Sequence, residues 1–97
     1  MNIRIEKIDT HEGVAVKALL DSGATGMFMD KRTAAKHGFM LKKLEKPIMV
    51  RNVDRTDNSR EAITYQVEAN VYYKGQVERM RMDVCDLGKM EVILGML

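Results

Sequence analysis

Alternation between apolar and polar residues is the clearest pattern in the chain, and it predicts strands. The pattern is longest over residues 63–73, where apolar side chains occupy every second position: Ile63, Tyr65, Val67, Ala69, Val71 and Tyr73. Because successive side chains of a strand point to opposite faces, this spacing predicts a long strand with one buried face. Lys74-Gly75 predicts a hairpin turn, and residues 77–84 predict the returning strand, whose inner face carries Met80, Met82 and Val84.

Shorter apolar segments predict the other strands. Residues 13–20 alternate and run directly into Asp21, residues 48–53 follow the single proline, Pro47, and residues 91–94 are almost continuously apolar. Residues 1–6 also alternate, which is not the pattern of a signal peptide.

One short helix is expected among these strands. Asp30 is a favourable N-cap for residues 31–37, and Gly38 is a favourable residue for ending the helix. Together these elements predict an all-β domain over residues 1–97, a closed, barrel-like packing of curved hairpins with one helix on its surface.

Composition limits the classes of function. A chain of 97 residues with 45% hydrophobic residues can bury a core, and its net charge of +2 gives no reason to expect an acidic membrane as partner. Its single cysteine, Cys85, excludes an internal disulfide and is interpreted as a buried, inert thiol. No apolar run approaches the roughly 18 residues of a membrane-spanning helix. We therefore expect an intracellular, cytoplasmic protein.

Neither a metal nor a nucleic acid is expected as a ligand. Two histidines and one cysteine do not make a convincing zinc site, and no other cofactor is predicted. Positive charge is concentrated in residues 31–46, but no aromatic residues alternate with it for base stacking. A solvated basic surface is the preferred interpretation.

Candidate chemistry lies where the predicted strand 13–20 ends, in the sequence Asp21-Ser22-Gly23-Ala24. An ionised aspartate leaving an apolar strand loses hydration, so it needs hydrogen bonds or a shared proton. Gly23 lacks the Cβ atom that would keep another backbone at a distance. An isolated Asp-Ser-Gly is more often a turn that caps backbone amides. Here the preceding leucines, and Val92-Ile93-Leu94-Gly95 near the other end, favour a catalytic position.

These two signatures, with Lys36-His37-Gly38 and Val71-Tyr72-Tyr73 between them, resemble the retropepsin family of aspartic proteases. The resemblance extends from about Glu12 to Gly95 and is closest to the proteases of gypsy-type LTR retrotransposons. It implies an acid-protease barrel and a pair of carboxylates that share one proton around a water molecule. Since this chain has a single Asp-Ser-Gly, the pair would consist of Asp21 from each subunit of a homodimer.

The resemblance also implies roles for neighbouring residues. Ser22 would hold the two active-site loops together, Gly23 would let the substrate backbone approach, and Ala24 would line the substrate site. Residues 51–62 are the candidate flap, with Asp54, Thr56 and Asn58 as candidate substrate contacts. This segment contains no glycine, the residue that usually supplies a flap's hinge freedom, although Asn58 can adopt a left-handed turn.

The function that the resemblance implies is an aspartic endopeptidase that processes a retroelement polyprotein as a homodimer, with a retroelement particle as a second location besides the cytoplasm. The alternative is a retropepsin-like dimerisation or binding module with weak catalysis. The intact Asp21-Ser22-Gly23 favours the enzyme, whereas the glycine-free flap favours the module. Relatives usually continue beyond the Ile-Leu-Gly strand, so we expect a truncated domain, open apolar surface near Asp21, and a weak dimer, micromolar or poorer.

Overall fold

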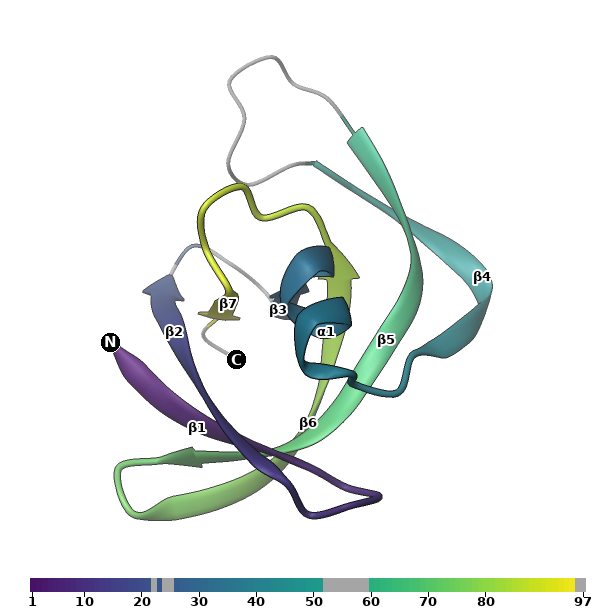
Figure 1. The fold of residues 1–97 in the computed structure, drawn as a ribbon. Coiled ribbons are helices and arrows are strands. Elements are labelled where there is room, and N and C mark those ends of the chain that lie inside the picture. The colour runs from purple at the N-terminus through teal and green to yellow at the C-terminus, as the bar shows by residue number, and fades with distance from the viewer. Residues whose placement is uncertain (22, 24–25, 52–59, 96–97) are drawn as a thin grey trace.

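A computed structural model describes residues 1–21, 23, 26–51 and 60–95 (Figure 1). The described residues form seven strands and one helix, in the order β1 (Asn2–Lys7), β2 (Gly13–Asp21), β3 (Met27–Asp30), α1 (Lys31–His37), β4 (Lys42–Arg51), β5 (Arg60–Tyr73), β6 (Gln76–Cys85) and β7 (Val92–Gly95).

Six of these strands close into a barrel. Their order is β1-β2-β7-β3-β6-β5, and antiparallel pairing between β1 and β5 completes the ring. β4 is an additional strand that pairs with the first part of β5, and α1 packs against β3 and β6 (Figure 1). The expected all-β closed barrel with one short helix is confirmed.

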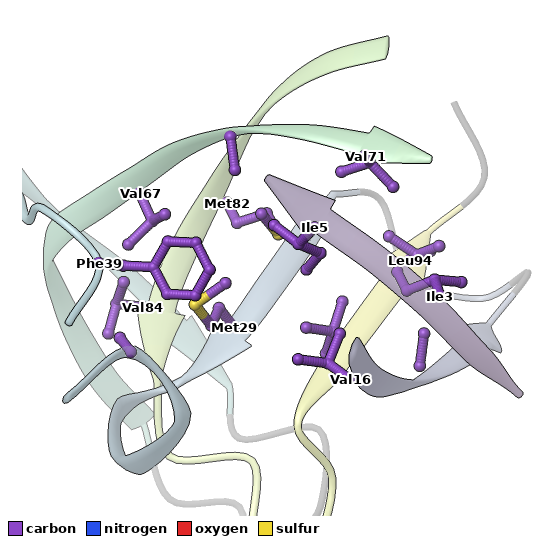
Figure 2. Close-up of a cluster of buried hydrophobic side chains, with 14 residues drawn as sticks. Ile3, Ile5, Val16, Met29, Phe39, Val67, Val71, Met82, Val84 and Leu94 are labelled. Carbon is purple, nitrogen blue, oxygen red and sulfur yellow. The ribbon is translucent and has the colours of Figure 1, made fainter. Parts of the chain in front are cut away.

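The alternating pattern of the sequence forms the barrel interior. Ile5 of β1, Val67 of β5 and Met82 of β6 are completely buried, and they lie in one apolar cluster with Val16 and Leu94 from the opposite wall (Figure 2). Burial of such side chains is the main favourable contribution to folding. The core therefore joins strands from both ends of the chain.

The prediction that Tyr65 lies on the buried face of the long strand is wrong. Tyr65 shares the alternation of its neighbours but is exposed, whereas Ile63 and Val67 on either side of it are buried. In this part of β5 the paired neighbour is β4, and pairing with β6 begins only at Gln66. Tyr65 pairs with Lys43, next to the shift of register in β4, and Ile63 beyond that shift is buried again. The alternation therefore continues along β5, but Tyr65 is not enclosed.

The strand expected after Pro47 begins earlier than predicted. β4 starts at Lys42 and passes through Pro47, with a shift of register against β5 between Lys43 and Ile48. A proline lacks the N–H group that pairing requires, and it is tolerated at an irregularity in an edge strand. β4 is such a strand, because among the described residues it pairs with β5 alone.

The predicted turns and helix limits agree with the structure. The Asp30 side chain accepts a hydrogen bond from the Arg32 amide, and Gly38 ends α1 in the left-handed conformation, with φ of 69°. Lys74 and Gly75 both have positive φ, which a two-residue hairpin between β5 and β6 requires. Two strands were not assigned from the sequence: β3, which is short, and β1, whose alternation was noted without a strand being predicted.

Candidate active site

Asp21 is the last residue of β2, and its position follows from a change of partner along that strand. β2 pairs with β1 up to Lys17, and its final residues then pair in parallel with β7. This register places Leu20 opposite Leu94 and Asp21 opposite Gly95. The Gly95 amide also donates a hydrogen bond of 2.9 Å to the Gly26 carbonyl, which ties β7 to the segment that precedes β3. The two sequence signatures are therefore adjacent, as predicted.

The Asp21 carboxylate is half-buried and bonds to the turn that follows it. Its Oδ1 atom accepts a hydrogen bond of 2.9 Å from the Gly23 amide. A Cβ atom on residue 23 would lie 3.3 Å from the same oxygen, closer than most such contacts, so glycine leaves the carboxylate accessible on this side. This arrangement keeps a carboxylate oriented at the end of a strand while part of it faces solvent.

The two leucines before Asp21 are exposed, although the strand that carries them is apolar in sequence. Leu19 is 43% exposed and Leu20 is 48% exposed, although Ala18 before them is buried. The last residues of β2 extend to the end of the barrel, where β7 is their paired neighbour. Two large apolar side chains are thus accessible next to the candidate catalytic carboxylate.

A second apolar cluster lies close to this end of the barrel. Ile93 of β7, which pairs with Leu19, packs with Phe28 of β3 and with Leu87 and Met90 from the β6–β7 connection. Cys85 belongs to the same cluster and is buried, as expected for a structural thiol. Residues of several strands and of the β6–β7 connection therefore form the apolar surroundings of the strand that supports Asp21.

Several predicted site residues cannot be placed. Ser22, Ala24, Asp54, Thr56 and Asn58 lie outside the described residues. The roles given to Ser22 and Ala24, and to the candidate flap, stay predictions.

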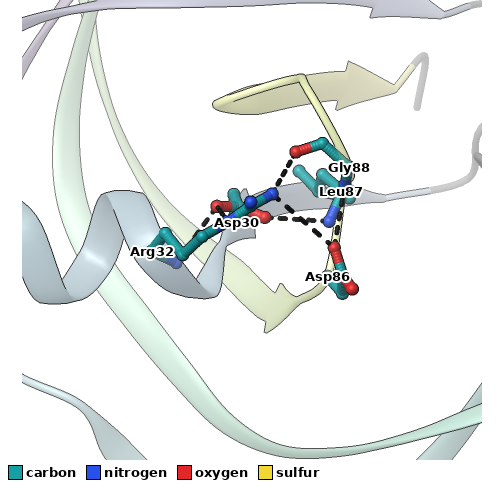
Figure 3. A network of polar contacts seen from close by, with 5 residues as sticks. All are labelled: Asp30, Arg32, Asp86, Leu87 and Gly88. Carbon is teal, nitrogen blue, oxygen red and sulfur yellow. Dashed lines mark hydrogen bonds and ion pairs between the residues drawn. The ribbon is translucent and has the colours of Figure 1, made fainter.

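Asp30 has a function in the fold that its sequence context only partly indicated. It is 3% exposed, and besides capping α1 it accepts a hydrogen bond of 2.9 Å from the Leu87 amide (Figure 3). Arg32, which also contacts this carboxylate, donates to the Gly88 carbonyl. The N-cap could be predicted from neighbouring residues, but the contact with Leu87 joins positions far apart in the chain.

Other polar clusters lie on the barrel wall. Glu6 accepts hydrogen bonds from Asn70 Nδ2 and the Tyr72 hydroxyl, and the bond from Asn70 is the main reason that the pKa of Glu6 is lowered. The hydrogen bond to Glu6 raises the pKa of Tyr72. On the β5–β6 hairpin, the Arg79 guanidinium lies 3.0 Å from Glu68 and lowers the pKa of that carboxyl. These pairs connect neighbouring strands.

Two kinds of feature, a metal-binding cluster and a membrane-spanning helix, are absent from the described residues. Within residues 1–21, 23, 26–51 and 60–95, no three histidine, cysteine or acidic side chains form a group that could hold a metal ion. In the same part of the chain, no helix has the length and apolar character needed to cross a bilayer.

Comparison with known proteins gives one family and a consistent fold. The family described as "PEG10/RTL1 protease domain" matches residues 17–97. The chain is similar to the retroviral protease-like domain of Ddi1 from Leishmania major, with 23% identity and a TM-score of 0.57 over 98% of this chain and 70% of that one. It is also similar to EIAV protease complexed with the inhibitor HBY-793, with 17% identity and a TM-score of 0.58 over 98% and 78% of the two chains. At these identities the structural likeness shows the retroviral-protease fold.

Proposed function

This chain belongs to the PEG10/RTL1 protease domain family and has a retropepsin-like fold, and from that premise we propose that it is an aspartic endopeptidase. Its active site would be completed by Asp21 of a second, identical subunit. The observation that carries the proposal is the position of Asp21: a half-buried, oriented carboxylate opposite Gly95, at the end of a strand whose two preceding leucines are exposed.

The proposed reaction uses the two Asp21 carboxylates as a unit with one shared proton. Two carboxylates in close contact do not both ionise, so one is charged and the other is protonated. The charged group accepts a proton from water as the water oxygen bonds to the peptide carbonyl carbon, while the protonated group donates its proton to the carbonyl oxygen. The carboxyl that gained the water proton then donates it to the nitrogen as the C–N bond breaks, and a hydroxyl of the intermediate returns its proton to the other carboxylate. The products are a carboxylic acid and an amine.

The exposed leucines support association of two chains at this end of the barrel. Leu19 and Leu20, on the two faces of β2, both leave apolar area in water, and exposed apolar area of this kind is available for interaction. A homodimer with a two-fold axis near Asp21 would cover this area and bring the two carboxylates together. An extended segment of a polyprotein is the proposed substrate.

A dimerisation or binding module is the second candidate. It is favoured by one observation, the absence of glycine from residues 51–62, where a closing flap is expected. Such a module would associate through the same leucines but would hydrolyse peptides poorly.

Replacing the catalytic carboxylate tests the enzyme proposal. We expect Asp21→Asn to reduce hydrolysis of fluorescein-labelled casein by at least about a hundredfold, because general acid–base catalysis requires the shared proton. Activity should be greatest at acidic to mildly acidic pH and should be blocked by pepstatin. Asp9→Asn, the same change at an exposed residue in the β1–β2 connection, is the matched control.

Sedimentation of the same proteins separates the two candidates. The enzyme proposal predicts a dimer in the wild type and in Asp21→Asn, with hydrolysis in the wild type alone. A dimer without pepstatin-sensitive hydrolysis would indicate the module. Turnover in Asp21→Asn equal to that of the wild type would contradict the assignment of Asp21.

A further inference from the structure

Asp30 is a buried carboxylate that the proposed catalytic pair does not use. Its Oδ2 atom accepts hydrogen bonds from the Arg32 amide at 3.0 Å and from Arg32 Nε at 3.2 Å, and its Oδ1 atom accepts from the Leu87 amide at 2.9 Å. Burying a charged group is costly unless such bonds replace its hydration. Capping a short helix needs one of the two oxygens, so the other is available to hold Leu87.

The segment 86–91, which connects β6 to β7, is held by Asp30 at both ends. The side chain of Asp30 binds the Leu87 amide, and its main-chain amide donates a hydrogen bond of 2.9 Å to the Glu91 carbonyl. Between these points the Met90 amide bonds to the Leu87 carbonyl. Asp30, at the end of β3, therefore holds this connection at two points.

Arg32 adds a second, more exposed contact to the same segment. Its Nη2 atom donates to the Gly88 carbonyl and lies 3.9 Å from Asp86 Oδ1, as Figure 3 shows. The Arg32 side chain is largely in solvent, where ionic contacts are screened and contribute little. The buried Asp30–Leu87 bond is thus the stronger tie.

The position of this connection affects the surroundings of Asp21. Leu87 is completely buried and packs with Phe28, Met90 and Ile93, and Ile93 pairs with Leu19 two residues before Asp21. β7 then continues to Gly95, opposite Asp21. A displacement at Leu87 would therefore reach the apolar residues beside the catalytic carboxylate through direct contacts.

We propose that Asp30 is a positioning residue for peptide binding, which holds Leu87 and Met90 so that the apolar surroundings of Asp21 keep their shape. This proposal rests on the proposed peptidase function. It extends that function to a residue that does not touch the reacting atoms. Small displacements of groups that position a substrate reduce rates strongly, which is why a remote hydrogen bond can matter.

Asp30→Ser separates helix capping from loop positioning. A serine hydroxyl caps helices as well as aspartate does, but its single oxygen cannot also reach the Leu87 amide. Arg32→Gln is the matched control, because it removes the exposed contact and leaves the Asp30–Leu87 bond. Each protein is assayed with casein and pepstatin, and rates are expressed per folded molecule from circular dichroism. Hydrogen exchange of the Leu87 amide is measured alongside.

In Asp30→Ser we expect Leu87 exchange to be at least about tenfold faster, with the amide of Met82 unchanged. We expect kcat/KM to fall about tenfold, mainly through a higher KM, and pepstatin to bind correspondingly more weakly. Arg32→Gln should change each quantity less than threefold. An unchanged Leu87 exchange rate would overturn the proposal, and so would faster exchange with wild-type KM and pepstatin affinity.

Failure of the proposed function gives a different result. If the wild type binds pepstatin but hydrolyses nothing, the peptidase proposal fails, and the ratio of pepstatin affinities still decides the role of Asp30. If the wild type neither binds nor hydrolyses, both proposals are wrong.

Discussion

The barrel interior and the Asp21 end contain the same kind of side chain in different surroundings. Ile5 and Met82 are completely enclosed by strands on all sides, whereas Leu19 and Leu20 are close to half exposed. The enclosed residues stabilise the single chain. The exposed leucines bury less area within the chain and therefore contribute less to the fold, and in the proposed homodimer they would contact the partner.

The adjacent pair Leu20 and Leu94 shows this difference most directly. They are partners in the parallel register of β2 and β7, yet Leu94 is buried in the core and Leu20 is exposed. The contrast shows that the neighbouring strands cover Leu94 but do not cover Leu20, so the enclosed part of the barrel ends between these two side chains. Stability and association should therefore respond separately to mutations on the two sides of this boundary.

The largest effect is expected in the interior. Met82→Ala should lower the free energy of unfolding by about 2–5 kcal/mol, because it removes buried apolar atoms and leaves a cavity. Met40→Ala, at a methionine that is 67% exposed where Met82 is 0% exposed, should change it by less than about 0.5 kcal/mol. Urea unfolding of both variants measures the difference. Equal losses would contradict the assignment of Met82 to the core.

A smaller effect is expected at the Asp21 end, and it concerns association. Leu20→Ser should weaken the proposed homodimer about tenfold, roughly 1.4 kcal/mol, while the stability of the single chain changes little. Leu41→Ser is the control, since Leu41 is 46% exposed and Leu20 is 48% exposed. Sedimentation equilibrium gives the dissociation constants. If both variants weaken the dimer equally, the exposed leucine beside Asp21 has no special role in association.

The β5–β6 hairpin tests whether changes far from Asp21 leave function intact. Gly75 has φ of 76°, and a Cβ atom there would meet nothing within 4 Å. Gly75→Ala should therefore cost about 1 kcal/mol of stability through backbone strain alone. Thermal unfolding measures the cost. The kcat/KM of Gly75→Ala per folded molecule should equal that of the wild type. A large fall would show that the β5–β6 hairpin and the Asp21 end of the barrel are coupled.

The smallest effect concerns pH. The bond from Asn70, with smaller contributions from His11 and Tyr72, lowers the pKa of Glu6 from its ordinary value of 4.5. A carboxyl whose pKa is lowered by folding contributes stability above its unfolded pKa, and that contribution is lost as the pH falls through the folded value. Glu6→Gln should be less stable than the wild type at pH 7, and the difference should disappear at about pH 2.

Thermal unfolding at the two pH values checks this expectation. Asn70→Ala should reduce the effect of Glu6→Gln at pH 7, since it removes the main cause of the lowered pKa. A difference between wild type and Glu6→Gln that persists unchanged at pH 2 would exclude the proposed cause.

The sequence by itself determined the features that depend on neighbouring residues. Alternation over residues 63–73 predicted the long strand β5, Lys74-Gly75 predicted its hairpin, and the ends of α1 followed from Asp30 and Gly38. Side-chain alternation, turn conformation and helix capping are local properties, so they can be predicted before the fold is known. The adjacency of Asp21 and Gly95 followed from resemblance to a family.

Tertiary structure alone decided which apolar residues are enclosed and what the buried carboxylate holds. Tyr65 and Leu20 fit the alternation of buried positions but are exposed, and Asp30 binds Leu87 across a long separation in sequence. The physical reason is that enclosure and long-range hydrogen bonds depend on which strands become neighbours. A strand's alternation specifies its two faces, but the strands packed around it determine where each face is covered.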